Sequence, residues 1–288
     1  MKRVVTLSIG MLALAGTTMS TQAADLGARP IPSAPILAPT PVANWSGFYV
    51  GVGLGARWND SDWQTTCLAP LLLGTVGCPN DVFFPAFTRF GTANPTNFSQ
   101  AGVRGSVYGG YNWQFANWVA GIEGDAGWSD NSQTVAGIPG TFNAVLGPGA
   151  DTATLRDRWD ASARLRLGYL VTPTALLYAT GGVAFLDTQI SASCAGTFPV
   201  GWCGIAQAGS VSTTFTGWTA GGGVEWMFAP NWIVRGEYRF SDYGTKSFQF
   251  LGAIPADSFN FTVKEQTHTA YVGLHYLFNW AAPVVSRY

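Results

Sequence analysis

Apolar and polar residues alternate along residues 217–240. Residues 217–228 place tryptophan, valine and alanine on one face and glycine, threonine and glutamate on the other. After the sequence Ala-Pro-Asn at 229–231 the alternation resumes to Phe240. A period of two residues is that of a β-strand. Two such strands joined by a three-residue turn predict a β-hairpin.

The same alternation predicts six further strands, and eight strands in all. They lie at 45–57, 101–113, 118–128, 159–171, 175–187 and 265–278. The strands are long enough to cross a bilayer when tilted. The alternation itself does not decide which face points outward, since a soluble barrel shows the same pattern with its apolar face inside.

The connections between the strands favour a membrane barrel. We expect turns of about three or four residues after the second, fourth and sixth strands, and roughly 20 to 40 residues after the first, third, fifth and seventh, which is the pattern of outer-membrane barrels. Aromatic side chains near the strand ends would then lie at the two membrane interfaces. The expected interface aromatics are Trp45, Trp113, Trp118, Trp128, Trp159, Trp218, Trp226, Trp232 and Phe278. The sequence therefore predicts an all-β fold, an eight-stranded antiparallel transmembrane barrel with long extracellular loops.

An outward apolar face sends charged residues of both signs into the interior. The expected interior network is Arg104, Glu123, Asp125, Arg164, Arg166, Glu225, Arg235, Glu237 and Arg239, together with Arg158 and Asp160. An eight-stranded barrel is wide enough only for its own side chains, so we expect a structural network. The alternative is a narrow, porin-like path for small solutes.

Composition agrees with a membrane protein. Hydrophobic residues make up 47% and charged residues only 11% of the chain, against about 25% charged in typical soluble domains. The net charge of -1 argues against a nucleic-acid partner, which requires a basic excess.

The amino terminus reads as an export signal. Two basic residues precede an apolar run at 4–15, and small residues follow, so 1–23 is expected to be a signal peptide for the Sec pathway, cleaved after Ala23 or Ala24. Residues 24–44 are rich in proline and predict an extended periplasmic linker. We expect the barrel to span 45–278 and a tail to follow at 279–288.

The four cysteines are expected to form disulfides, because an exported chain meets an oxidising compartment. Cys67 with Cys78 and Cys194 with Cys203 would each close a short loop within one connection. Metal binding is the alternative, but no histidine cluster accompanies the cysteines, and no metal or cofactor is expected.

Several motifs resemble those of a known family. They are Trp-Ser-Gly-Phe-Tyr-Val-Gly at 45–51, Gly-Gly-Tyr-Asn at 109–112, Tyr-Ala-Thr-Gly-Gly-Val-Ala at 178–184 and Val-Arg-Gly-Glu-Tyr at 234–238. The chain is similar to the small outer-membrane β-barrel proteins of α-proteobacteria, the group of the rhizobial and Brucella major outer-membrane proteins, whose fold looks like the OmpA membrane domain. Such barrels commonly end on an aromatic residue of the last strand, whereas this chain continues past Phe278.

The resemblance implies a location in the outer membrane and a role in envelope integrity and surface contact. The partners it implies are outer-membrane lipid and lipopolysaccharide, with peptidoglycan or host surface ligands as further candidates. It implies no catalytic residues.

Catalysis is also not expected from the residues themselves. Lipid-cleaving barrels resemble one another in a His and a Ser on the lipid-facing wall, which act as general base and nucleophile. His268 faces outward by parity, but no serine accompanies it, and His275 faces inward without a nucleophile.

Overall fold

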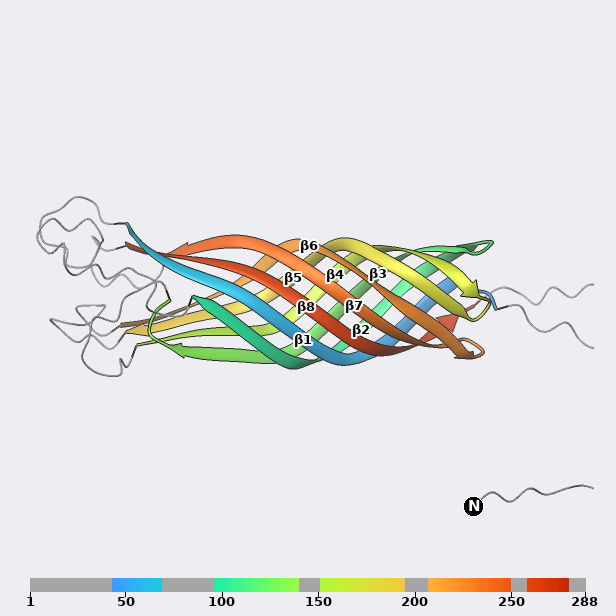
Figure 1. The fold of residues 1–288 in the computed structure, drawn as a ribbon, viewed down its shortest axis with the longest axis horizontal. Coiled ribbons are helices and arrows are strands. Elements are labelled where there is room, and N and C mark those ends of the chain that lie inside the picture. The colour runs from blue at the N-terminus through green and yellow to red at the C-terminus, as the bar shows by residue number, and fades with distance from the viewer. Residues whose placement is uncertain (1–42, 69–95, 140–150, 195–206, 250–257, 280–288) are drawn as a thin grey trace, which may run out of the picture. The chain divides into compact units, whose positions relative to one another are not determined.

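A computed structural model describes residues 43–68, 96–139, 151–194, 207–249 and 258–279. These residues form a closed barrel in which each strand pairs with its sequence neighbours and β1 closes the ring with β8 (Figure 1). The strands are β1 (Gly47–Leu68), β2 (Asn97–Phe115), β3 (Trp118–Ala136), β4 (Thr152–Thr172), β5 (Ala175–Cys194), β6 (Gln207–Ala229), β7 (Trp232–Gln249) and β8 (Ser258–Phe278). The predicted fold, eight antiparallel strands in a ring, is confirmed.

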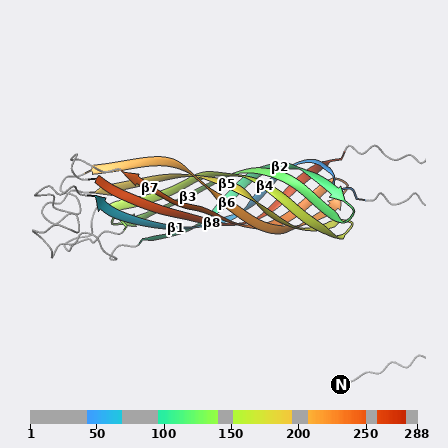
Figure 2. The same ribbon diagram turned by 90° about the horizontal axis from the view of Figure 1, so that it is seen from above.

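The barrel has two unlike ends (Figures 1 and 2). At the turn end, two residues join β2 to β3, β4 to β5 and β6 to β7, where the sequence predicted three or four. Ala116 and Asn231 in these turns have positive φ values of 52° and 68°, the left-handed backbone that tight hairpins require. At the loop end, the connections comprise residues 69–96, 137–151, 195–206 and 250–257.

The strands are longer at the loop end than the sequence predicted. β6 begins at Gln207 rather than at 217, and β8 begins at Ser258 rather than at 265. Three of the four loop-end connections are therefore shorter than expected, and only residues 69–96 fall in the predicted range. The predicted limits were wrong because they were placed where the outward apolar face ends, whereas the strands continue with a different polarity.

That polarity reverses along the barrel axis. Toward the turn end, apolar side chains such as Leu54 and Val224 point outward and are exposed, while charged side chains point inward. Toward the loop end, Trp63, Phe215 and Phe261 are fully buried inside the barrel, and the residues that alternate with them are polar. We call these two parts the belt half and the loop-end half.

The belt half matches the thickness of a membrane. Exposed tryptophans bound its outer wall, for example Trp118 near the turn end and Trp128 near the middle of β3. Ten steps of about 3.3 Å along a strand tilted by about 40° give a height of roughly 25 Å, the height of the apolar band of outer-membrane barrels. Separately, no helix in the described ranges is long and apolar enough to cross a membrane.

Candidate functional site: the filled interior of the barrel

Glutamates and arginines fill the middle of the barrel interior. Arg235 Nη2 lies 2.5 Å from Glu123 Oε2, and Arg164 contacts the other oxygen of the same carboxylate. The Tyr49 hydroxyl donates a further hydrogen bond of 2.6 Å to Glu123. Arg166 Nη2 lies 2.8 Å from Glu225 Oε1. Each of these ions is buried, and each has a partner of opposite charge, which is the condition under which buried charges are tolerated.

Two aspartates organise the part of this layer nearer the loop end. Asp125 is 2.6 Å from Arg104 Nη2 and 2.7 Å from Arg239 Nη1. Asp160 is 2.5 Å from Arg104 Nη2 and 2.8 Å from Arg57 Nη1. Glycine makes room for these side chains: at Gly127, a Cβ atom would overlap the Arg104 guanidinium. Glycines and arginines therefore share the inward-facing positions of the strands, and the glycines leave space for the arginine side chains.

The structure brings the predicted network residues together in this layer. Those that it places inside and buried are Arg104, Glu123, Asp125, Asp160, Arg164, Arg166, Glu225, Arg235, Glu237 and Arg239. Sequence reasoning omitted Arg57 from the network, although its position on the inward parity of β1 was available as a signal. It also omitted the tyrosines Tyr49 and Tyr178, whose hydroxyls bond to Glu123 and Glu237.

Arg158 was predicted to face inward, and this is wrong. The pairing of β4 with β5 skips a residue between Asp157 and Trp159, so a β-bulge turns Arg158 outward beside Trp159. Its guanidinium is about half exposed and lies 2.8 Å from Asp187 on β5. A bulge adds one residue to one strand, and strict alternation does not reveal it.

Trp45 was predicted at the membrane interface, and this is also wrong. Its side chain is fully buried in an apolar cluster with Leu176, Ile233 and Leu277 at the turn end. The indole Nε1 donates to the carbonyl of Pro173 at 3.0 Å, and the backbone nitrogen donates to Gln114 Oε1 at 2.8 Å. Because Trp45 precedes the first strand, it folds under the barrel instead of continuing the outward face.

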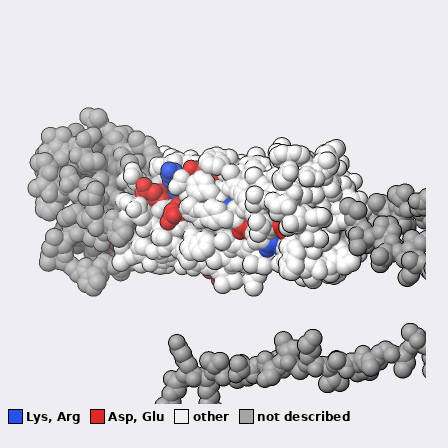
Figure 3. Space-filling model, turned by 45° about the vertical axis from the view of Figure 1, so that its right-hand side comes forward, with Lys and Arg blue, Asp and Glu red and all other residues white. Residues whose placement is uncertain are grey.

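A second apolar cluster fills the loop-end half. Trp63, Leu155, Leu186, Phe215 and Phe261 are among its fully or almost fully buried members. The charged layer is therefore bounded by apolar side chains on both sides along the barrel axis. Figure 3 shows the outer wall: charged atoms on this face lie toward the loop end and near the middle, and the wall near the turn end is free of them.

A pair of buried carboxyls lies between the charged layer and the loop-end cluster. Glu265 is fully buried, and the Ser61 hydroxyl donates a hydrogen bond of 2.6 Å to it. Asp157 accepts a hydrogen bond of 2.6 Å from Thr188, and its distance to Arg57 Nη2 is 3.9 Å. Burial, aided by the charge of Asp157, holds the pKa of Glu265 well above its usual range. Burial likewise raises the pKa of Asp157.

The other predicted interface aromatics line the outer wall. The exposed ones are Trp113, Trp118, Trp128, Trp159, Trp218, Trp226, Trp232 and Phe278. Trp128 and Trp159 lie opposite each other on β3 and β4 at the loop-end limit of the belt half. Trp58 on β1, also near the end of a predicted strand, is exposed there too and continues the outward parity of the first strand.

Both histidines bond to tyrosine hydroxyls. His268 Nδ1 is 2.7 Å from the Tyr238 hydroxyl on the outer wall, and its Nε2 is 3.9 Å from Asp60. His275 is buried inside the barrel, with Nδ1 at 3.2 Å from the Tyr108 hydroxyl. Neither contact is the histidine and serine arrangement of a lipid-cleaving barrel.

The predicted disulfides lie outside what the structure describes. Cys78 and Cys203 fall in the ranges 69–95 and 195–206. Cys67 and Cys194 are near the ends of β1 and β5, but their side chains are not described. Residues 1–42 and 280–288, which include the expected signal peptide and most of the linker and the tail, also lie outside the described ranges.

A closed antiparallel ring with an apolar outer band, aromatic residues at its limits and a filled interior defines a transmembrane β-barrel of the outer-membrane type. The family described as "Outer membrane protein beta-barrel domain" matches residues 10–278. The chain belongs to this family and is an outer-membrane protein.

Curated relatives agree with this assignment. The 31 kDa outer-membrane immunogenic protein of Brucella melitensis is 28% identical over 96% of this chain and 100% of the relative. The 22 kDa outer membrane protein of Rhizobium leguminosarum is 31% identical over 51% of this chain and 56% of the relative. Among solved structures, the outer membrane protease OmpT from Escherichia coli is similar over 81% of this chain and 97% of its own, at 11% identity and a TM-score of 0.48.

Proposed function

We propose that the protein is a closed, non-conducting and non-enzymatic barrel that strengthens the outer membrane and presents its loop end at the cell surface. The observation that carries the proposal is the filled interior. An apolar cluster around Trp45 and Leu176 occupies the turn end, and the paired charges around Glu123 occupy the middle. The cluster around Trp63 and Phe215 then occupies the loop-end half.

Each of these layers would have to open before a solute could pass. The central ions are held by several partners each, so moving one side chain would leave others buried and unpaired. The apolar clusters contain fully buried aromatic side chains, which would have to move out of the path of a solute. These features favour a structural interior over the porin-like path.

Conductance in planar lipid bilayers tests this function. We expect the pure, folded protein to insert without discrete current steps. Reproducible steps from a preparation that gives a single heat-shifted band in an unboiled gel would replace the closed barrel with the channel hypothesis. The heat-shifted band is needed because it shows that the protein in the measurement is a folded barrel.

A deletion strain separates the two functions in the cell. A structural barrel predicts that its loss raises the entry of a large hydrophobic dye and the sensitivity to detergent. A channel predicts that its loss lowers the uptake of small hydrophilic solutes instead. Peptidoglycan, reached through residues 24–44, and host surface ligands, reached through the loop-end connections, belong to the same proposal as partners. Pull-down with isolated peptidoglycan, with and without residues 24–44, tests the first of them.

A further inference from the structure

The outer wall changes in a fixed order along strands β3 to β6. At the loop-end limit of the belt half, Trp128 and Trp159 face lipid. Arg158 follows beside Trp159, and Arg156 points outward two residues further along β4. Beyond them the outward side chains are mainly hydroxyls, including Thr154 and others on the neighbouring strands. The wall thus passes from apolar to cationic to neutral polar within a few strand residues.

The two arginines are held outward by aspartates. Arg158 lies 2.8 Å from Asp187, and Arg156 Nε donates to Asp130 at 2.9 Å. Each arginine side chain is about half exposed, at 45% and 47%. The Arg156–Asp130 pair is exposed at both partners and is therefore weak. Asp187 is buried and fixes the orientation of Arg158, whose side chain stays about half exposed to an external anion. Arg156 and Arg158 are two residues apart and share one face of β4, and the bulge beside Trp159 turns that face outward.

The hydroxyl rows lie on the loop-end side of these arginines. Thr134, Thr154, Ser191 and Ser210 are consecutive partners across β3, β4, β5 and β6. Thr134 and Thr154 are 2.9 Å apart, and Gln189 on β5 donates to Ser210 at 3.1 Å.

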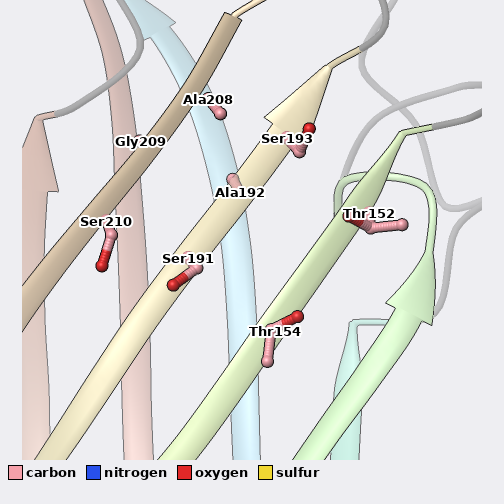
Figure 4. A pocket seen from close by; sticks show the side chains of 8 residues that line it. All are labelled: Thr152, Thr154, Ser191, Ala192, Ser193, Ala208, Gly209 and Ser210. Carbon is pink, nitrogen blue, oxygen red and sulfur yellow. The ribbon is translucent and has the colours of Figure 1, made fainter.

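A shallow depression of about 340 Å³ lies on this wall, and no charged side chain lines it (Figure 4). In the figure, the hydroxyl-bearing side chains come from three neighbouring strands. The residues that line the depression are Thr152, Thr154, Ser191, Ala192, Ser193, Ala208, Gly209 and Ser210.

We propose that this face of β3 to β6 binds the glycolipid of the outer leaflet. Acyl chains would lie against the belt half, an anionic group of the head would bind Arg156 and Arg158, and the neutral sugars would lie along the hydroxyl rows. Guanidinium groups bind phosphate and carboxylate through charge-assisted hydrogen bonds. Hydroxyls both donate and accept, as sugar hydroxyls do. The order on the wall therefore matches the order of chemical groups in such a lipid.

The opposite side of the barrel offers different chemistry at the same level. On β7, β8 and β1 the outward residues include Asp60, Asp62 and Asp242, with Lys264 among them. Gln266 Nε2 donates to Asp242 at 2.7 Å. Clustered carboxylates repel an anionic headgroup, so we expect binding to be confined to the β3 to β6 side. This contrast supplies a matched control within the same molecule.

Titration of the folded, full-length protein in detergent tests the inference. The probe is purified lipopolysaccharide, with phosphatidylglycerol as the anionic lipid control and binding read by native mass spectrometry. We expect lipopolysaccharide to bind. The double variant R156Q/R158Q should lower the affinity about tenfold, because it removes two charge-assisted contacts to the anionic group. The variant T154V/S191A should weaken intact lipopolysaccharide several-fold and leave a lipid with no sugar chain unaffected.

The variant D60N/K264Q on the opposite side should bind as the wild type does. Equal weakening by this control, or unchanged binding in R156Q/R158Q, would overturn the proposal. Equal affinity for phosphatidylglycerol would reduce the site to a general anion contact and would also overturn it. The lipid site rests on the proposed structural role of the barrel, but separate measurements test the site and the closed interior. Binding without conductance supports both, whereas conductance steps would reject the closed barrel and leave the wall site standing.

Discussion

The belt half and the loop-end half are built from the same eight strands, yet their inward and outward faces have opposite polarity. In the belt half, Leu54 faces out and Arg235 faces in. In the loop-end half, Phe215 faces in and Ser212 faces out. Because alternation fixes only which residues share a face, the surrounding solvent decides which face is apolar. The position of the reversal therefore marks the outer surface of the membrane.

The two halves also differ in what fills them. In the belt half the apolar side chains face the lipid, so the inward positions are left to polar residues. The middle of its interior consists of paired ions and tyrosines around Glu123. The loop-end half has water outside and carries a hydrophobic core, as a soluble barrel does. Stability should consequently depend on charge pairing in one half and on packing and neutral polar groups in the other.

The largest effect is expected for Glu123→Gln. The amide keeps the shape of the side chain but removes the charge that balances Arg164 and Arg235. Breaking a buried ion network by removing one partner costs about 3–5 kcal/mol of unfolding free energy. Urea unfolding of the protein in phospholipid vesicles, followed by tryptophan fluorescence, measures this loss.

An exposed carboxylate of the loop-end half is the control for that substitution. Asp60→Asn removes a charge at a residue whose side chain is 58% exposed. Its effect should stay below about 1 kcal/mol, because exposed ion pairs contribute little. Similar losses in both variants would contradict the view that the two halves rely on different forces.

The cost of a charge introduced on the outer wall should locate the membrane boundary between the two halves. Leu165→Arg places a cation on the lipid-facing wall of β4, where Leu165 is 68% exposed. We expect destabilisation of about 2–4 kcal/mol if the residue lies near the bilayer midplane. Ser212→Arg, on the outer wall of the loop-end half, should change stability by less than about 0.5 kcal/mol. Equal costs in vesicles would mean that the membrane boundary is not where the polarity reverses.

The sequence predicted the belt half well, because alternation, aromatic positions and turn lengths agree there. Sharp limits such as Trp118 and Trp128 are visible in the sequence, and the structure places both on the outer wall. The loop-end strands were missed for a physical reason. Where polarity reverses, the outward residues become serine and threonine, and short polar segments such as 207–216 read as loops although threonine favours strands.

The interior network could be located from parity, but its partners could not. Parity places Arg104 and Asp160 inside, yet their 2.5 Å contact depends on the stagger of β2 against β4, two strands away. The bulge at Arg158 and the folding of Trp45 under the barrel break the alternation locally, and no alternation rule anticipates them. The burial of Glu265 was not predicted, because the last strand was expected to begin at this residue, whereas it begins at Ser258.

A further effect is expected at Glu265, and its sign is opposite to that of Glu123. Glu265 is a fully buried carboxyl in the loop-end half, with Asp157 and Arg57 as the charged groups that act on it and Ser61 as its hydrogen-bond donor. Glu265→Gln should stabilise the protein at pH 8, because ionising the buried carboxyl costs more in the folded chain than in the unfolded chain, and the neutral amide carries no such cost.

The pH dependence follows from the raised pKa of Glu265, and the raised pKa of Asp157 acts in the same direction. Below about pH 4 both the folded and the unfolded carboxyl are protonated, and the variant and the wild type should be equally stable. As the pH rises above the unfolded pKa, the unfolded chain releases the proton first, so the stability of the wild type falls until the folded pKa is reached. The variant lacks the part of this fall that Glu265 contributes and keeps the part that Asp157 contributes. Urea unfolding at pH 4, 6 and 8 measures it, and a wild type that gains stability relative to Glu265→Gln with rising pH would show that Glu265 is ionised and paired.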